Sequence, residues 1–170
     1  TGRYDTDRVF PTITPSMDIE VSSNFERALF DAYDRDGAAV AQLMGEMKQG
    51  GFGISKGALH ALREHFDSGR SSDEETSATI QTFFATTGEV LCPHSAVGVK
   101  VAEDHLGSSP MITLATAHPA KFPDAVAAAV GLRPTLPRWL ADLFDRDERV
   151  TEMPNDLQLM KSLVRERIAL

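Results

Sequence analysis

Met111-Ile112-Thr113-Leu114-Ala115-Thr116-Ala117-His118-Pro119-Ala120-Lys121 is the stretch that decides the fold class. Its first six residues are nearly continuous in apolar character, as in a strand that is buried on both faces. Pro119 ends this run, and the Ala-rich segment from Asp124 to Val130 has the composition of a helix. The stretch therefore predicts a buried strand followed by a helix, which is typical of α/β proteins.

Helical patterns flank this unit on both sides. Apolar spacing, caps and breakers predict helices over residues 23–33, 37–47, 56–66, 72–86, 93–106, 137–144 and 155–168. The last helix is amphipathic, and the residues expected to face inward are Leu157, Met160, Leu163, Val164 and Ile168. Residues 9–14 are predicted as an edge strand or an extended connection, and residues 149–152 as a short extended segment. So few candidate strands indicate a helix-rich α/β chain whose sheet partners lie outside it.

Local signals set several helix boundaries. Ser55 is positioned to cap the helix over residues 56–66, and Ser72 with Glu75 forms a capping-box pattern. The segment Gly50 to Gly57 resembles a phosphate-binding loop, but it follows a helix and lacks the Gly-Lys-Ser/Thr ending. We interpret it as a helix stop, a short strand and a helix start.

Composition excludes several classes of protein. The chain has 170 residues, of which 42% are hydrophobic and 25% charged, and its formal net charge is −8. This balance favours a globular domain and disfavours a nucleic-acid binder. No apolar stretch reaches the roughly 20 residues of a membrane span, and no signal peptide opens the chain. The single cysteine, Cys92, suits a reducing compartment, so we expect a cytoplasmic protein without membrane partners.

The turn that leaves the predicted strand is the first candidate for chemistry. Open α/β sheets place ligands at the carboxyl ends of their strands, where Thr116, His118 and Lys121 would lie. Thr116 could hydrogen-bond a ring nitrogen, His118 could act as acid or base, and Lys121 could meet an anion or form an imine. Equally, Thr116 could end the strand, His118 could bond locally and Lys121 could be solvated.

Other candidate chemistries have little support in the sequence. The five histidines show no ligand spacing for a metal, so we expect no metal site. Cys92 lies two residues from His94 without a third orienting group, and no Gly-x-Ser-x-Gly motif occurs. The polar segment from Thr14 to Arg27 is either a turn with an N-cap or a loop that faces an anionic substrate.

Three ordered blocks resemble the threonine synthase family. The first is Ser16-Met17-Asp18-Ile19 with Ser22-Ser23-Asn24-Phe25-Glu26-Arg27, which is similar to the family's Ser-Pro-Ser-Met-Asp-Ile and Ser-Ser-Asn-Phe-Glu-Arg segments. The second joins Thr87-Gly88-Glu89 to Pro93-His94-Ser95-Ala96-Val97-Gly98, similar to Asp-Pro-His-Thr-Ala-Val-Gly. The third is Leu114-Ala115-Thr116-Ala117-His118-Pro119-Ala120-Lys121-Phe122, which matches Thr-Ala-His-Pro-Ala-Lys-Phe.

This resemblance implies a pyridoxal-phosphate enzyme of fold type II, a helix-rich α/β fold related to tryptophan synthase β with mostly parallel strands. The implied reaction converts O-phospho-L-homoserine and water into L-threonine and phosphate. The family's imine-forming lysine and its phosphate loop lie in early motifs that do not occur in these 170 residues. Residues 1–170 thus resemble the C-terminal portion of the family fold, so we expect the chain alone to be inactive and its main partner to be the N-terminal portion.

The resemblance also assigns residues. Thr116 matches the family threonine that hydrogen-bonds the cofactor's pyridine nitrogen, whereas Lys121 is a poor choice for the imine. Four further residues are weaker near-site candidates by block membership: His118, Ser16, Asn24 and Arg27. Cys92 stands where the family usually has Asp, and Ser95 where it often has Thr, so we expect a weaker helix cap at residue 92.

Two expectations concern organisation and an alternative function. Residues 31–70 match no named family function and are expected to form a helical excursion that packs on the smaller domain beside the cofactor. The alternative to an enzyme is a non-catalytic threonine-synthase-like protein that binds or regulates.

Overall fold

A computed structural model of the chain describes residues 1–6, 9–19 and 22–168. The chain divides into two compact units, Thr1–Pro134 and Thr135–Leu170, and each is described by itself. The first unit holds β1 (Arg3–Asp5), α1 (Phe25–Ala32), α2 (Gly37–Met47), β2 (Gly51–Gly53), α3 (Lys56–His65), α4 (Asp73–Thr87), α5 (Pro93–Asp104), the 3-10 turn η1 (Pro119–Lys121) and α6 (Pro123–Val130). The second unit holds the 3-10 turns η2 (Arg138–Leu140) and η3 (Leu143–Asp145) and the helix α7 (Leu157–Ile168).

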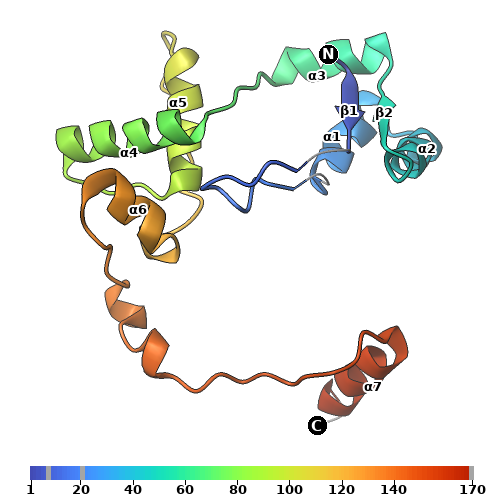
Figure 1. Cartoon of the computed structure of the whole chain (residues 1–170). Helices are drawn as coiled ribbons and strands as arrows, with labels where there is room; N and C mark the ends of the chain where they lie inside the picture. Colours follow the sequence, from blue (N-terminus) through green and yellow to red (C-terminus); the bar gives the residue numbers. More distant parts are fainter. Residues whose placement is uncertain (7–8, 20–21, 169–170) are drawn as a thin grey trace. The chain divides into compact units, whose positions relative to one another are not determined.

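One core of the first unit forms between β1, β2 and the helices α1 to α3. The two strands pair antiparallel (Figure 1), with Tyr4 opposite Phe52. The rings of these two residues stack with centroids 5.2 Å apart. Gly51 has φ +135°, and a Cβ there would lie 2.2 Å from the Tyr4 carbonyl oxygen, so this close strand approach requires glycine. The buried members of this core are Leu29, Val40, Leu43 and Phe52. Residues 31–70 therefore share one core with β1 and the start of α1.

A second core forms where α4, α5 and α6 pack together (Figure 1). Ile80, Ala96 and Ala129 are its buried centre, one from each helix. Gln81 Nε2 also donates to the carbonyl oxygen of Ala129 at 2.8 Å, which satisfies one of the free carbonyls at the end of α6. This core holds the N-terminus of α5 in place.

The predicted helix boundaries are confirmed where a cap marks them. Ser55 accepts a hydrogen bond from the Ala58 N–H, and both halves of the capping box between Ser72 and Glu75 are formed. Gly88 and Gly131 end α4 and α6 in the left-handed conformation that glycine favours. Because these signals lie in neighbouring residues, the sequence alone is sufficient to place them.

The prediction of a buried strand from Met111 to Thr116 is wrong. These residues pair with no strand in the described ranges, whose one sheet is β1 with β2, and Ile112 and Leu114 are 82% and 74% exposed. A strand requires a partner for its backbone groups, and apolar composition alone does not supply one. Residues 9–14 form no strand, which agrees with the second of the two predicted options, a connection. Residues 149–152, predicted as a short extended segment, lie outside any helix or strand.

Two predictions for the second unit are wrong: the helix over residues 137–144 and the inward face of the last helix. Two 3-10 turns, η2 and η3, replace the first of these helices. The helix α7 forms as expected, but four of its five supposedly inward residues are about half or more exposed: Leu157, Met160, Val164 and Ile168. Amphipathic spacing identifies an apolar face but does not say which element covers it. No helix in the described part of the chain is long and apolar enough to cross a membrane.

Candidate functional site

The N-terminus of α5 joins parts of all three sequence blocks. Its first residues, from Cys92 to Ala96, are all buried. Pro93 occupies the first helical turn, where its missing N–H costs nothing, and the Cys92 sulfur accepts a hydrogen bond from the Ser95 N–H at 3.3 Å. Cys92 is thus an N-cap, as expected from the sequence.

Ser95 links α5 to the third block. Its Oγ accepts a hydrogen bond from the backbone N–H of Thr116 at 3.1 Å and lies 3.2 Å from the Cys92 sulfur. Ser95 is 3% exposed, whereas Thr116 is exposed. The backbone of Thr116 is therefore anchored on a buried hydroxyl while the residue itself remains accessible.

His94 links α5 to the first block and to the end of the third. Its Nε2 accepts a hydrogen bond from the backbone N–H of Ser16 at 3.1 Å. Its ring lies against Phe122, with centroids 4.4 Å apart and the planes tilted by 44°. Because Nε2 accepts, the imidazole carries its proton on Nδ1, and Nδ1 is buried without a hydrogen-bond partner in the described residues.

The environment of His94 keeps its ring neutral. Burial is the main cause that lowers its pKa below the usual 6.5, and the positive charge of Lys121 lowers it further. The carboxylate of Asp18 acts in the opposite direction and is outweighed. A neutral His94 is the form that can accept from Ser16.

The loop that carries Ser16 has its own internal bonds. The Asp18 carboxylate accepts from the N–H and the hydroxyl of Thr12, each at 2.7 Å, and the Met17 N–H donates to the Thr14 carbonyl at 2.8 Å. The loop is therefore held both within itself and by His94.

The turn after Thr116 is structured by His118. Its Nδ1 accepts from the Ala120 N–H at 3.1 Å and so caps the turn η1. The Nζ of Lys121 lies 5.8 Å from the centre of the Phe122 ring. His118 thus has the local hydrogen bond that was one of the two options, and both it and Lys121 are exposed.

Asn24 and Arg27 lie elsewhere in the first unit. Asn24 precedes α1 and makes no side-chain capping bond, and Arg27 is exposed on that helix. In the described residues, no hydrogen bond or ion pair links either side chain to the residues around α5. The structure therefore gives these two candidates no place in the cluster.

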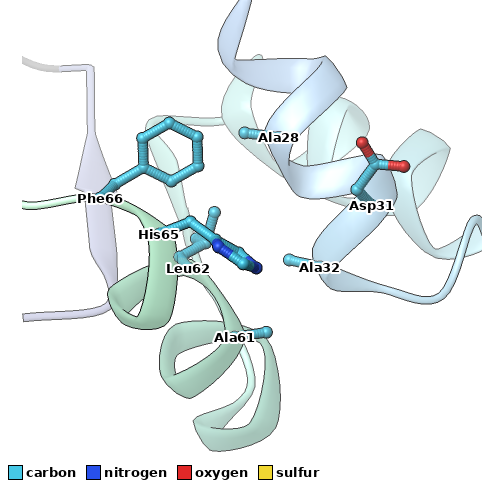
Figure 2. Close-up of a pocket in the computed structure, with 7 residues that line it drawn as sticks. All are labelled: Ala28, Asp31, Ala32, Ala61, Leu62, His65 and Phe66. Carbon is cyan, nitrogen blue, oxygen red and sulfur yellow. The ribbon is translucent and has the colours of Figure 1, made fainter.

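A separate pocket of about 300 Å³ lies between α1 and α3. Figure 2 shows the His65 ring between the two helices, with Asp31 on the α1 side. Space remains between the two helices because small side chains line this pocket: Ala28, Ala32 and Ala61. Asp31 already pairs with Arg35, at 3.2 Å. This pocket shares no residue with the cluster around α5.

Sequence reasoning missed His94 as the residue that joins the blocks. Its neighbour Ser16 is 78 positions away, so no local pattern indicates the contact. The pairing with Cys92, judged weak from the sequence, is not formed, since the Cys92 sulfur bonds Ser95 instead. In residues 1–6, 9–19 and 22–168, no group of three His, Cys, Asp or Glu side chains could hold a metal ion.

Comparisons with known proteins identify the family of this chain. The family described as "Threonine synthase, C-terminal" matches residues 95–164. A threonine synthase from Pseudomonas aeruginosa is 47% identical over 167 residues, which are 96% of this chain and 36% of that protein. The crystal structure of PLP-bound threonine synthase from Brucella melitensis has a TM-score of 0.85 and 52% identity over 98% of this chain and 36% of that one. "Threonine synthase-like 1" of Homo sapiens is 34% identical over 138 residues, covering 78% of this chain and 18% of that protein.

The arrangement is a helix-rich α/β portion of the fold type II class. The chain belongs to the threonine synthase family, and the match is to the C-terminal part of its members. It spans about a third of the length of the first relatives it matches, 36% in each case.

Proposed function

We propose that this chain is the C-terminal part of a pyridoxal-phosphate-dependent threonine synthase. The complete protein would convert O-phospho-L-homoserine and water into L-threonine and phosphate. The observation that carries this proposal is the meeting of three family blocks at the N-terminus of α5, where Ser95 anchors Thr116 and His94 anchors Ser16.

The residues present fit one side of a cofactor site. Thr116 is accessible and its backbone is anchored, so its hydroxyl can be held at a fixed place toward a flat heteroaromatic ring. Lys121 is exposed beside Phe122 and His118 is used as a turn cap, so neither is needed for that contact. The imine-forming lysine and the phosphate loop would come from outside these residues.

The role of this chain in the chemistry follows from Thr116. When bound, pyridoxal phosphate supplies the electron sink for proton movements at the substrate's carbon atoms. A neutral hydroxyl at the ring nitrogen favours the unprotonated ring nitrogen more than a carboxylate would. The task of Thr116 is to orient the ring and to set the charge at this one atom.

Three coarser properties belong to the same proposal. We place the protein in the cytoplasm, because the one cysteine of this chain is buried and free. We also infer that the protein acts on a small molecule. The N-terminal portion of the same protein is its main partner, and it covers the exposed residues 111–116. Residues 31–70 form the helical excursion beside the cofactor domain.

A non-catalytic threonine-synthase-like protein is the second candidate, and one similar protein carries the name "Threonine synthase-like 1". In that case the fold would be kept for binding or regulation. Sequence upstream of this chain discriminates the two: a lysine in the family motif and a phosphate loop favour the enzyme.

The test is phosphate release from O-phosphohomoserine with added pyridoxal phosphate. It compares this chain with the complete product of its gene. Release by the complete product alone supports the proposal. Release by neither, with no absorbance from protein-bound cofactor, supports the non-catalytic role, and release by the chain alone would show that it needs no other portion.

A further inference from the structure

We propose that Ser95 is a positioning residue for the reaction: through its hydrogen bond to the Thr116 backbone, it sets where the Thr116 hydroxyl lies. This inference rests on the proposed function, which assigns Thr116 to the cofactor. It goes beyond it because Ser95 touches neither cofactor nor substrate in this scheme and acts only through Thr116.

Hydrogen bonds link Ser95 both to Thr116 and to Cys92. The Thr116 N–H can only donate, so Ser95 Oγ is the acceptor in their 3.1 Å contact. The Ser95 hydroxyl also lies 3.2 Å from the sulfur of Cys92, a contact in which either group can donate. The same sulfur accepts the Ser95 N–H at 3.3 Å. Cys92, Ser95 and Thr116 therefore form a connected series of hydrogen bonds that ends at the proposed cofactor contact.

Burial gives this series its rigidity. Cys92 and Ser95 are 1% and 3% exposed, so water does not compete for their polar groups. Ser95 belongs to the first turn of α5, and Ala96 beside it lies in the core with Ile80 and Ala129. The hydroxyl that holds Thr116 is thus fixed by a packed helix, whereas residues 111–116 have no strand partner in the described residues to fix them.

Among the residues that the structure describes, Ser95 is the side chain that anchors the backbone of this segment at its carboxyl end. Because Thr116 is the residue that the bond reaches, the loss of Ser95 Oγ should displace its hydroxyl more than it unfolds the helix. Such a displacement lowers turnover without removing any group that contacts the cofactor.

The experiment uses the complete product of the gene, loaded with pyridoxal phosphate, and a double-mutant cycle. The variants are Ser95→Ala, Thr116→Val and both together, with Ser95→Thr as the matched control that keeps a hydroxyl. The measurements are kcat and KM for O-phosphohomoserine, the absorbance maximum of the bound cofactor, and the thermal unfolding midpoint. We expect Ser95→Ala to lower kcat about tenfold with little change in KM.

The cycle separates positioning from simple stability. If Ser95 acts through Thr116, the double variant has nearly the kcat of Thr116→Val alone, and Ser95→Thr recovers most of the wild-type kcat. Effects that multiply, or an unchanged kcat for Ser95→Ala, would overturn the inference. The inference would also be overturned if the loss of kcat in Ser95→Ala were explained by a lower unfolding midpoint alone, with the absorbance maximum of the bound cofactor unchanged. Failure of the proposed function differs from all of these, since the wild-type protein itself would then release no phosphate.

Discussion

The backbone N–H of Ser16 donates to Nε2 of His94 across 78 positions of sequence, at 3.1 Å. This bond joins a loop near the start of the chain to the first turn of α5. The loop itself is otherwise held by the carboxylate of Asp18 on Thr12. His94 is thus the residue through which the first and third sequence blocks meet, since its ring also packs on Phe122.

Replacement of His94 should loosen the Ser16 loop. His94→Phe keeps a ring against Phe122 but leaves the Ser16 N–H without its acceptor, at a cost of about 1–3 kcal/mol. His94→Gln is the matched variant, because its side-chain oxygen can accept at a similar reach. Hydrogen exchange over residues 12–18 should quicken in the Phe variant more than in the Gln variant. Equal exchange in all three proteins would contradict the role assigned to this bond.

The lowered pKa of His94 gives stability a defined pH dependence. Its pKa in the folded protein lies below 6.5, so the unfolded chain takes up a proton first as the pH falls. The contribution of His94 to the free energy of unfolding is complete above pH 6.5 and is lost as the pH falls from there through the folded-state pKa. Denaturant midpoints measured on both sides of pH 6.5 should show this loss in the wild type. A variant His94→Phe should lack that component, and the same acid slope in both would refute the assignment.

Thr116→Val tests the proposed cofactor contact. The substitution keeps the shape of the side chain and removes the hydroxyl, so we expect weaker binding of pyridoxal phosphate and turnover lower by about tenfold. Thr113→Val is the matched control, because it makes the same change in the same extended segment. Titration of the apo-protein with cofactor, followed by absorbance, measures the affinity. If both variants bind pyridoxal phosphate and turn over substrate like the wild type, Thr116 is not part of the cofactor site.

Gly51→Ala should disrupt the pairing of β1 with β2. The new Cβ would lie 2.2 Å from the Tyr4 carbonyl oxygen, and φ there is +135°, so we expect a loss of at least about 2 kcal/mol. Gly45→Ala is the control, since that glycine lies in α2 with nothing within 4 Å of a Cβ. It should stabilise the helix by about 0.5–1 kcal/mol. Unfolding midpoints of the two variants should therefore move in opposite directions, and a shared direction would count against the local geometry.

Ser72→Ala should fray the start of α4. It removes the acceptor for the Glu75 N–H at 3.2 Å and half of the capping box, which is worth about 1 kcal/mol. Ser68→Ala is a suitable comparison, because it removes an exposed hydroxyl ahead of the helix. Hydrogen exchange of the first turn of α4 should quicken in the Ser72 variant alone.

Local chemistry made most of the helices predictable, and distant contacts limited the rest. The caps at Ser55 and Ser72 act over three residues, so the sequence is sufficient to place them. The exposure of Ile112 depends on a partner strand that composition does not specify. The 3-10 turns that replace the predicted helix over residues 137–144 and the exposed apolar face of α7 have the same origin, because an apolar pattern does not specify which element will pack on it.

In the candidate site, too, the features set by distant contacts could not be predicted from the sequence. Thr116 and Ser16 are candidates because of the blocks they belong to. His94 also belongs to a block, but it is set aside because its pairing with Cys92 lacks a third orienting group. Its burial, its tautomer and its lowered pKa all arise from residues far along the chain.

The uncovered run from Met111 to Thr116 has a practical use in protein engineering. Its exposed apolar side chains, on a segment that pairs with no strand in the described residues, offer a surface to a complementary piece, as in a split reporter. Under the proposed function, two separately expressed pieces that meet at this surface would report their reassembly through phosphate release. Exposed residues such as Ile112 and Leu114 would then tune the affinity between the two pieces.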